Sequence, residues 1–297
     1  MKYVITGGAG HISGPLSEKL LEAGHKVTVI GRDASKLAKL KEKGAVTAIG
    51  SVEDASFLTS AFNGADAVYL MIPPNFQTGD FRGYQRVVGQ NYITALKSAG
   101  IRKVVFLSSI GAHMGKGSGP VDGLSDFEQL ITKELPDTDA VFLRPSYFYQ
   151  NFFTQAGMIK GMNVMGDNYL FSKEKMVLTH PSDIAEVAFQ LLVKPVFTGK
   201  TVRYIASDER TTEEIRQALA SAAGKPETPW IQFSDEQSLA GMQQAGIPEG
   251  LAKDYVEMGI ALREGKMQED YWKNRPALGR VKLEEFAKEF AAVYANI

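Results

Sequence analysis

Short apolar segments alternate with amphipathic segments through the first half of the chain. The apolar segments, rich in Val and Ile, predict strands at residues 3–5, 26–30, 46–49, 67–71, 103–107 and 140–143. Segments with apolar positions three and four residues apart predict helices at residues 12–23, 35–43, 55–62, 81–99 and 125–133. Apolar strands that alternate with helices are typical of right-handed βαβ units. The pattern therefore predicts an α/β fold with a Rossmann-type doubly wound parallel sheet.

The ends of several predicted helices carry recognisable signals. Gly24, Gly44 and Gly100 each follow a helical segment, as expected of residues that end a helix. Ser125 and Glu128 have the spacing of a capping box, which predicts that a helix begins at Ser125.

The pattern changes after Arg144-Pro145. Residues 146–178 are rich in aromatic residues, Gly, Met and Asn, and we expect them to be loop-like. The remainder predicts strands and helices at residues 181–193, 201–205, 211–223, 229–233, 235–245, 251–263 and 283–294. We therefore expect a first domain at residues 1–150 and a smaller, mainly helical C-terminal substrate lobe at residues 151–297. Residues 182–205 are expected to pack back on the first domain.

Composition narrows the classes of function. The 297 residues are 44% hydrophobic and 23% charged, with a net charge of −1, which argues against non-specific nucleic-acid binding. No cysteine is present, so disulfides and thiolate chemistry are excluded, and the histidines lack metal-site spacing. The apolar runs are too short for a membrane span, and Met1-Lys2 leads directly into a strand without a signal peptide. We expect a cytoplasmic protein that binds neither membranes nor nucleic acid; its oligomeric state stays open.

A glycine-rich turn follows the first predicted strand. Thr6-Gly7-Gly8-Ala9-Gly10-His11-Ile12-Ser13 joins this strand to an amphipathic helix. Such a turn lets a dinucleotide pyrophosphate approach bare backbone at a helix N-terminus. Gly7 would supply the tight turn and Gly10 the close approach, while Ser13 replaces the third glycine of the usual G-x-G-x-x-G spacing. The turn predicts dinucleotide binding, although glycine-rich turns also simply join strands to helices.

The end of the second predicted strand bears on the choice of cofactor. At this position an acidic residue binds the ribose of NAD, whereas an arginine accommodates the 2′-phosphate of NADP. Arg32 suits the phosphate, and Lys36, expected one turn into the next helix, is a second cation. Asp33 could instead accept from a ribose hydroxyl, and all three residues could belong to a solvated loop. We expect NADP, with NAD as the alternative.

Two further strand ends provide candidate contacts to the cofactor. Ligands bind at the carboxyl ends of parallel strands, near the point where the strand order reverses. Met71, Ile72 and Pro73 end the fourth predicted strand and are expected to flank the cofactor. Ser108 and Ser109 end the fifth and could face the nicotinamide, or could only cap the strand.

Taken together, these motifs resemble the NmrA-like family of atypical short-chain dehydrogenase/reductases. The residues that carry the resemblance run in order along the chain: Thr6–Leu16, Gly31-Arg32-Asp33, Tyr69–Pro74, Ser108-Ser109, Leu143–Asn151, Ser182–Ala185 and Leu283–Ala287. The resemblance implies a Rossmann domain, a small C-terminal lobe, and NAD(P) in the cleft between them. It also implies roles for individual residues. It implies that the pyrophosphate is lined by the residues that match the family's positions, which are Gly7, Gly10, His11 and Ile12.

The resemblance assigns the other cofactor contacts in the same way. It implies that Arg32 and Lys36 hold the 2′-phosphate. The residues that it places beside the ribose and the nicotinamide are Met71, Ile72, Pro73 and Ser108.

Catalysis is where the chain departs from typical short-chain dehydrogenases. Those enzymes carry Tyr-x-x-x-Lys on the helix after the fifth strand, but residues 117–130 contain neither Tyr nor Lys. Tyr169 and Lys173 have the spacing but lie in the lobe, where we expect a hairpin with an outward lysine. His113 and Lys116 are weak candidates for proton transfer. The catalytic residues are therefore left unassigned.

An aromatic cluster follows the sixth predicted strand. Tyr147, Phe148 and Phe152 would suit a flat apolar substrate, with Asn151 as a polar contact, or would form a hydrophobic contact between lobe and domain. The resembling family includes quinone and dye reductases, together with regulators that bind NAD(P) without turnover. We expect an NADPH-dependent reductase of quinones or similar conjugated aromatic compounds. The alternative is a non-catalytic redox-sensing regulator; a sugar epimerase would need the absent tyrosine base.

Overall fold

The computed structural model describes all residues from Met1 to Ile297, which form two compact units. Unit 1 comprises Met1–Ser109, Asp122–Arg144 and Ile184–Arg203. Unit 2 comprises Ile110–Val121, Pro145–Asp183 and Tyr204–Ile297. The chain therefore passes between the units several times.

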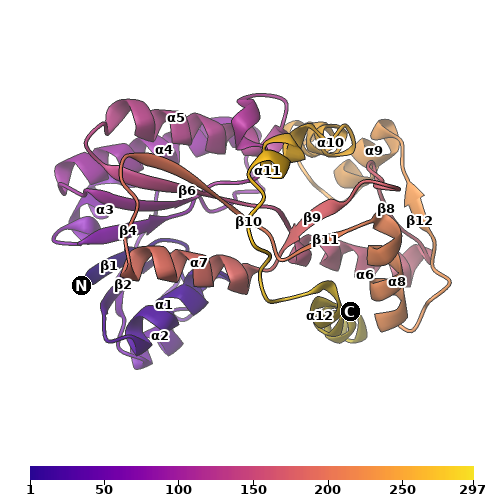
Figure 1. Cartoon of the computed structure of the whole chain (residues 1–297), viewed down its shortest axis with the longest axis horizontal. Coiled ribbons are helices and arrows are strands. Elements are labelled where there is room, and N and C mark those ends of the chain that lie inside the picture. The colour runs from indigo at the N-terminus through magenta and orange to yellow at the C-terminus, as the bar shows by residue number, and fades with distance from the viewer. The chain divides into compact units, whose positions relative to one another are not determined.

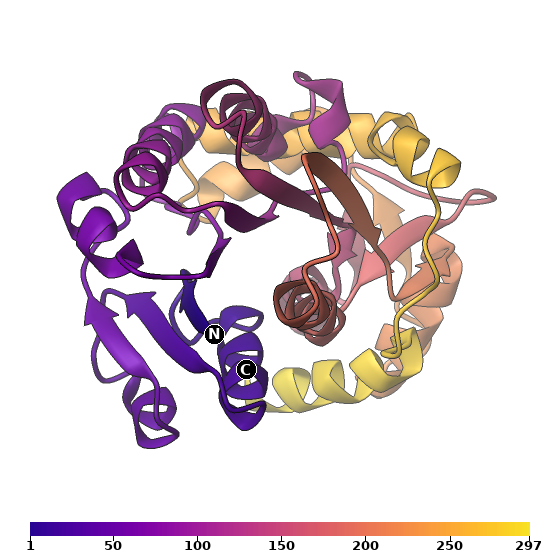
Figure 2. The ribbon, with the colours of Figure 1, turned by 60° about the vertical axis from the view of Figure 1, so that its left-hand side comes forward.

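Unit 1 is built on a seven-stranded sheet with the order β10-β6-β5-β4-β1-β2-β3. Its strands are β1 (Lys2–Ile5), β2 (Lys26–Gly31), β3 (Val46–Ile49), β4 (Ala67–Leu70), β5 (Lys103–Leu107), β6 (Asp139–Pro145) and β10 (Lys200–Ile205). The pairings of β1 with β2 and with β4 are parallel, and the strand order reverses between β1 and β4. Figure 2 shows β6 and β10 side by side. The predicted doubly wound parallel sheet is confirmed.

Helices cover both faces of this sheet. They are α1 (Ser13–Glu22), α2 (Ala38–Glu42), α3 (Ala55–Phe62), α4 (Phe81–Ser98), α5 (Asp122–Glu134) and α7 (Pro181–Val193). Figure 1 shows α4 and α5 on one face and α1, α2 and α7 on the other. The strands are apolar on both sides because both faces are covered; Val4, Val68 and Val104 are all fully buried. Positive φ angles at Gly24, Gly44 and Gly100 confirm the predicted helix ends.

The predicted capping box at Ser125 was wrong. Helix α5 begins at Asp122, so Ser125 and Glu128 both lie inside it, and both are buried. The Glu128 carboxylate instead accepts from the Arg144 guanidinium at 2.6 Å and 3.1 Å. Pairing with a buried cation explains why this carboxylate is tolerated in the interior, where an unpaired charge is costly.

Unit 2 contains two small sheets and several helices. One sheet has the order β11-β9-β7 and the other pairs β12 with β8. The strands are β7 (Tyr147–Phe148), β8 (Met165–Asp167), β9 (Met176–Thr179), β11 (Asp208–Arg210) and β12 (Trp230–Gln232). The helices are α6 (Phe153–Met162), α8 (Thr212–Ala222), α9 (Asp235–Gln244), α10 (Glu249–Arg263), α11 (Glu269–Lys273) and α12 (Leu283–Asn296). The expectation that residues 146–178 would be loop-like was therefore wrong.

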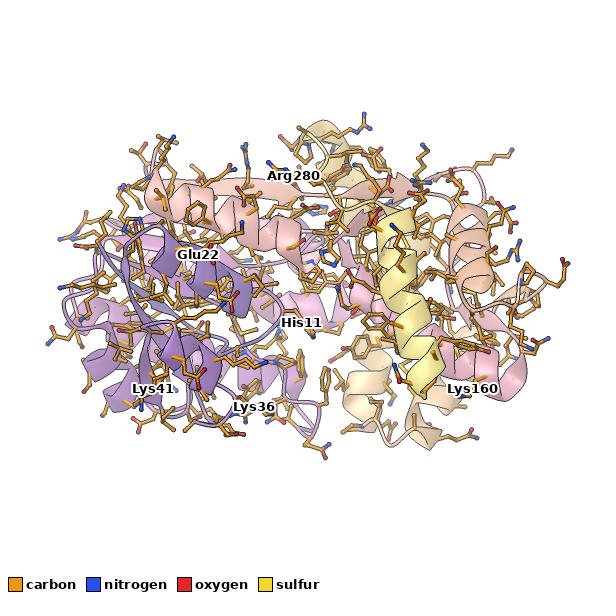
Figure 3. All side chains as sticks on the ribbon, turned by 90° about the horizontal axis from the view of Figure 1, so that it is seen from below. His11, Glu22, Lys36, Lys41, Lys160 and Arg280 are labelled. Atoms are coloured by element: carbon orange, nitrogen blue, oxygen red, sulfur yellow. The ribbon has the colours of Figure 1, made fainter.

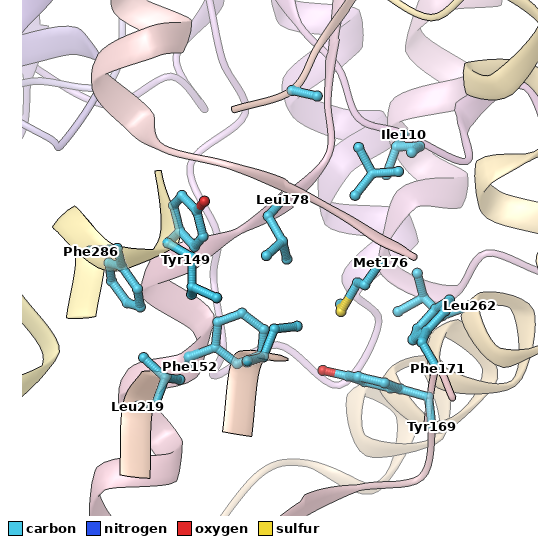
Figure 4. Close-up of a cluster of buried hydrophobic side chains, with 14 of the residues drawn as sticks. Ile110, Tyr149, Phe152, Tyr169, Phe171, Met176, Leu178, Leu219, Leu262 and Phe286 are labelled. Atoms are coloured by element: carbon cyan, nitrogen blue, oxygen red, sulfur yellow. The ribbon is translucent and has the colours of Figure 1, made fainter. Parts of the chain in front are cut away.

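The core of unit 2 is strongly aromatic. Tyr149 stacks on Phe286 with ring centroids 4.8 Å apart and an interplanar angle of 12° (Figure 4). Phe152 lies in the same cluster and is fully buried, and Tyr169 is only 2% exposed. These rings come from η3 (Tyr149–Phe152), from α12 and from the segment after β8, so the cluster joins residues distant in sequence.

Removing the partner of Arg144 should destabilise the fold strongly. Glu128→Ala is expected to lower the free energy of unfolding by about 3–5 kcal/mol, because it leaves a buried guanidinium without its carboxylate. The control is Glu134→Ala, whose carboxylate pairs with Lys97 on the surface at 2.8 Å and should contribute little to stability. Urea unfolding of both variants measures the difference; equal losses would contradict the assignment.

Candidate functional site

The turn after β1 brings backbone segments close together. Gly7 has φ = +95°, and a Cβ there would lie 2.5 Å from Ser13 Oγ and 2.9 Å from Met71 Cγ. A Cβ at Gly10 would lie 3.1 Å from the Gly7 carbonyl oxygen. Only glycine fits Gly7 without strain or displacement, which leaves bare backbone at the start of α1.

The N-terminus of α1 is not capped by a side chain. Ile12 occupies the N-cap position without a capping hydrogen bond, and the first turn contains no acidic residue. Ser13, which replaces the third glycine of the usual spacing, is buried and donates from its Oγ to the Thr6 carbonyl at 2.8 Å. This bond ties the helix to β1. The Gly14 N–H donates to the Gly10 carbonyl at 2.9 Å, so the helix continues the glycine turn. A helix start without a side-chain cap or an acidic residue beside a glycine turn fits an anionic pyrophosphate, because the positive end of the helix dipole lies there.

Hydrogen bonds fix the end of β4 beside this turn. The Met71 N–H donates to Thr6 Oγ1 at 2.8 Å, and Tyr92 Oη donates to the Met71 carbonyl at 2.8 Å. Ile72 is buried and Pro73 is partly exposed. The segment Met71–Pro73 therefore borders the point where the strand order reverses, as expected. Sequence reasoning missed Thr6 and Tyr92, whose role becomes visible only when β1 and β4 are neighbours.

The end of β2 presents two cationic side chains and a carboxylate that already accepts hydrogen bonds from a neighbouring residue. Asp33 accepts from the Ser35 N–H at 2.9 Å and from Ser35 Oγ at 2.6 Å, and these bonds lower the pKa of its carboxyl. Arg32 and Lys36 are exposed, and Figure 3 shows Lys36 and His11 on unit 1. We expected Lys36 one turn into the next helix. Helix α2 begins only at Ala38, so Lys36 lies in the turn that precedes the helix.

The two serines after β5 differ in their surroundings. Ser108 is 3% exposed, and its Oγ donates to the buried Glu128 carboxylate of the Arg144 pair. Ser109 is partly exposed. The hydroxyl of Ser108 is therefore used inside unit 1, and Ser109 is the more accessible of the two residues.

The residues of unit 2 that were expected to contact the substrate differ in how exposed they are. Tyr147 and Phe148 form β7 and are partly exposed, and Asn151 is exposed. Phe152 is fully buried in the core, with its ring centroid 5.2 Å from that of Tyr147. Phe152 thus supports the Tyr147 ring from inside the unit, while the other three residues present accessible surface.

Behind Tyr147 lies a hydrogen bond that the sequence did not predict. Tyr169 Oη donates to Tyr147 Oη at 3.0 Å. Burial raises the pKa of Asp167 to about 6, despite hydrogen bonds from Asn168 and Tyr169 that lower it.

The weaker candidates for proton transfer lie elsewhere in unit 2. His113 forms part of η1 (Ala112–Met114). The hydrogen bond from Lys273 lowers the pKa of the Glu269 carboxyl, and His113 adds a smaller contribution in the same direction. Lys116 is exposed on the following loop. Tyr169 and Lys173, which share the Tyr-x-x-x-Lys spacing, do not form the expected hairpin, because β8 and β9 belong to different sheets. Lys173 is exposed, whereas Tyr169 is buried against Tyr147.

The glycine turn and the sheet around it are shared with known proteins. Residues 7–195 match the family described as NAD(P)H-binding. A curated relative, the NAD(P)H azoreductase of Xenophilus azovorans, is 28% identical over 256 residues, which covers 86% of this chain and 85% of that protein.

Solved structures share the whole fold. The NADPH-dependent quinone oxidoreductase QOR2 of Escherichia coli, in complex with NADPH, superposes with a TM-score of 0.80 at 20% identity, covering 97% of this chain and 99% of that one. The Citrobacter sp. triphenylmethane reductase complexed with NADP(H) gives a TM-score of 0.78 at 20% identity, covering 98% and 100%. No helix of the present chain has the length and apolar character needed to cross a membrane.

The raised pKa of Asp167 has a consequence for stability. The folded chain binds this proton with a pKa of about 6 and the unfolded chain with an ordinary value of 3.8, so stability falls as pH rises between these values. Asp167→Asn should remove the penalty, raising the free energy of unfolding by about 2–3 kcal/mol at pH 8 and little at pH 4.

Asp139→Asn is a control for which the opposite effect on stability is expected. The Lys103 ammonium holds the pKa of Asp139 below its usual value. Asp139→Asn should therefore lower stability at pH 8 and have a smaller effect in acid. Chemical unfolding at both pH values tests the pair; a loss of stability in Asp167→Asn at pH 8 would contradict the assignment.

Proposed function

Because the chain belongs to the NAD(P)H-binding family, we propose that this NAD(P)H-dependent oxidoreductase transfers a hydride from NADPH to a quinone or a similar conjugated aromatic compound. The membership agrees with the resemblance to NmrA-like atypical short-chain dehydrogenase/reductases seen in the sequence. One observation supports NADPH over NADH as the cofactor. The end of β2 offers the exposed Arg32, whereas the neighbouring Asp33 carboxylate is held by Ser35.

The pyrophosphate would bind at the start of α1. Gly7 and Gly10 keep side chains out of the turn, and the N-terminal backbone of α1 at His11 and Ile12 has no side-chain cap. Such groups stabilise negative charge through N–H donation and the helix dipole. Bound there, NADPH supplies a hydride from its nicotinamide ring.

The remaining contacts extend from this turn along the strand ends. Arg32 and Lys36 would hold the 2′-phosphate through charge-assisted hydrogen bonds. Met71, Ile72 and Pro73 would flank the ribose and ring, together with Ser109. Ser108 would act through its bond to Glu128 by fixing the backbone after β5.

Unit 2 would receive the substrate. Tyr147 and Phe148 present partly exposed aromatic rings, and Asn151 an exposed amide. Flat conjugated molecules stack on such rings and accept a hydrogen bond from an amide or hydroxyl. The names of the relatives support this class, since azo compounds, quinones and triphenylmethane dyes are all conjugated aromatic compounds that accept two electrons. NADH would be the alternative cofactor.

Cofactor choice can be tested at Arg32. Arg32→Ala is expected to weaken NADPH binding by about 10- to 100-fold, because a charge-assisted bond to phosphate is lost, and to leave NADH binding nearly unchanged. Calorimetric titration with both cofactors measures this. Lys41→Ala, which removes an exposed cation within α2, is the control and should bind both as the wild type does. Equal weakening of both cofactors by Arg32→Ala would rule out phosphate recognition.

Turnover itself needs a separate test. The purified protein is expected to oxidise NADPH when benzoquinones, naphthoquinones or azo dyes are added, followed at the nicotinamide absorbance band. Binding of NADPH without turnover across this panel would contradict the proposal. That outcome would favour a cofactor-binding regulator, in keeping with the absence of Tyr and Lys from residues 117–130.

A further inference from the structure

One residue of the loop after β2 binds an acidic neighbour that would otherwise recognise NAD. We propose that Ser35 holds the Asp33 carboxylate and thereby makes this loop a site for a 2′-phosphate and not for a 2′-hydroxyl. The inference rests on the proposed function, because it explains the preference for NADPH that is part of it. Arg32 and Lys36 remain the residues that contact the phosphate, whereas Ser35 is a positioning residue that acts through Asp33.

Asp33 lies where an acidic residue would favour NAD. An acid near the end of the second strand accepts a hydrogen bond from the adenosine ribose of NAD, whereas an arginine accommodates the 2′-phosphate of NADP. This chain carries both in succession, Arg32 and Asp33, so the residue types alone support either cofactor. An unrestrained carboxylate beside the ribose would also repel a bound phosphate, because like charges oppose each other. Preference for NADPH therefore needs a group that removes Asp33 from ribose recognition.

Ser35 supplies two hydrogen-bond donors to this carboxylate. Its N–H donates to Asp33 Oδ1 at 2.9 Å and its Oγ donates to the same oxygen at 2.6 Å. These two bonds are the largest causes that lower the pKa of the Asp33 carboxyl, as expected of donors directed at its ionised form. The two hydroxyls of a ribose would need both oxygens of a carboxylate as acceptors. Because Oδ1 is directed at Ser35, Asp33 does not offer that pair.

Leu37 anchors this loop to the glycine-rich turn within unit 1. The Leu37 side chain is 1% exposed, and a Cβ at Gly31 would lie 3.2 Å from its Cδ1 and a Cβ at Gly8 3.7 Å from its Cδ2. The Gly8 N–H also donates to the Ile30 carbonyl, near the end of β2, at 2.9 Å. The exposed residues 32–36 are therefore a short span between the strand and a buried side chain. The hydrogen bonds inside this span decide which of its charges is available to a cofactor.

The cations of this span are available, whereas its carboxylate is engaged. Arg32 and Lys36 flank Asp33 in the sequence, and both are exposed. A guanidinium and an ammonium bind phosphate through charge-assisted hydrogen bonds. The span thus offers two cations to a 2′-phosphate, while its one acid accepts from the N–H and hydroxyl of Ser35. Releasing that acid should move the preference of the loop from NADPH towards NADH.

Removing the Ser35 hydroxyl tests the inference, with calorimetric titration of NADPH and NADH into the full chain. In Ser35→Ala, NADPH is expected to bind more weakly and NADH more tightly. The ratio of the two Kd values should shift by about tenfold, the lower end for a hydrogen bond to a charged group. Ser60→Ala is the matched control, because the Ser60 hydroxyl is also exposed in unit 1 and donates within α3 to the Ser56 carbonyl at 3.1 Å. Its ratio should equal that of the wild type.

A double-variant cycle shows whether Ser35 acts through the carboxylate. In an Asp33→Asn background, Ser35→Ala should leave the ratio of the two Kd values unchanged, because no carboxylate is released. An equal shift in both backgrounds would mean that Ser35 contacts the phosphate directly or only shapes the loop, and it overturns the inference. A Ser35→Ala variant with the wild-type ratio overturns it as well.

A measurement without cofactor separates this inference from the proposed function. In protein labelled with carbon-13 at the aspartate carboxyl groups, the pKa of Asp33 should lie below its usual value in the wild type and rise towards it in Ser35→Ala. An unchanged titration would mean that Ser35 does not hold the carboxylate, and it overturns the inference. A wild type that prefers NADH contradicts the proposed function instead. The inference is then decided by the Asp33 titration and by whether Ser35→Ala binds NADH more tightly than the wild type.

Discussion

The fold around the candidate cofactor site depends on how closely three backbone segments meet after β1. Gly7 cannot carry a Cβ without meeting Ser13 and Met71, so the turn, the helix and the end of β4 are packed to contact there. Two hydroxyls, those of Thr6 and Ser13, hold this arrangement by bonding the backbone of neighbouring elements. The close approach of these segments and the side-chain-free start of α1 are thus two results of the same packing, and the proposed cofactor contacts follow from both.

Much of unit 1 is predictable because its signals are local. The strands β3 and β5 and helix α3 begin and end where apolar pattern and flanking residues place them. Glu128 shows where local reasoning fails. Its spacing from Ser125 resembles a capping box, yet its carboxylate pairs with Arg144 on strand β6, which is distant in sequence. The start of α2 was missed for a similar reason, since the Asp33–Ser35 bonds favour a turn over a helix.

Unit 2 was less predictable because its strands are short and pair at long range. Residues 165–167 pair with 230–232, and 147–148 pair with 178–179. Of these segments only 230–232 was predicted as a strand, because the others are too short to show a strand pattern by themselves. The sequence singled out Tyr169 for its spacing from Lys173 and Tyr147 as a substrate contact, but it did not predict the hydrogen bond between them. The sequence shows that this segment is rich in aromatic residues. It does not show that Phe152 is buried and that Tyr147 is partly exposed.

The uncapped start of α1 has a consequence for the protein as a whole. Because no side chain caps this helix and no acidic residue lies in its first turn, an anion bound there would meet the positive end of the helix dipole without a competing group of the chain. Any molecule that binds there only in the folded state adds stability in proportion to the logarithm of its concentration. A nicotinamide dinucleotide bound there would therefore protect the folded chain from unfolding and proteolysis in proportion to the logarithm of its supply in the cell.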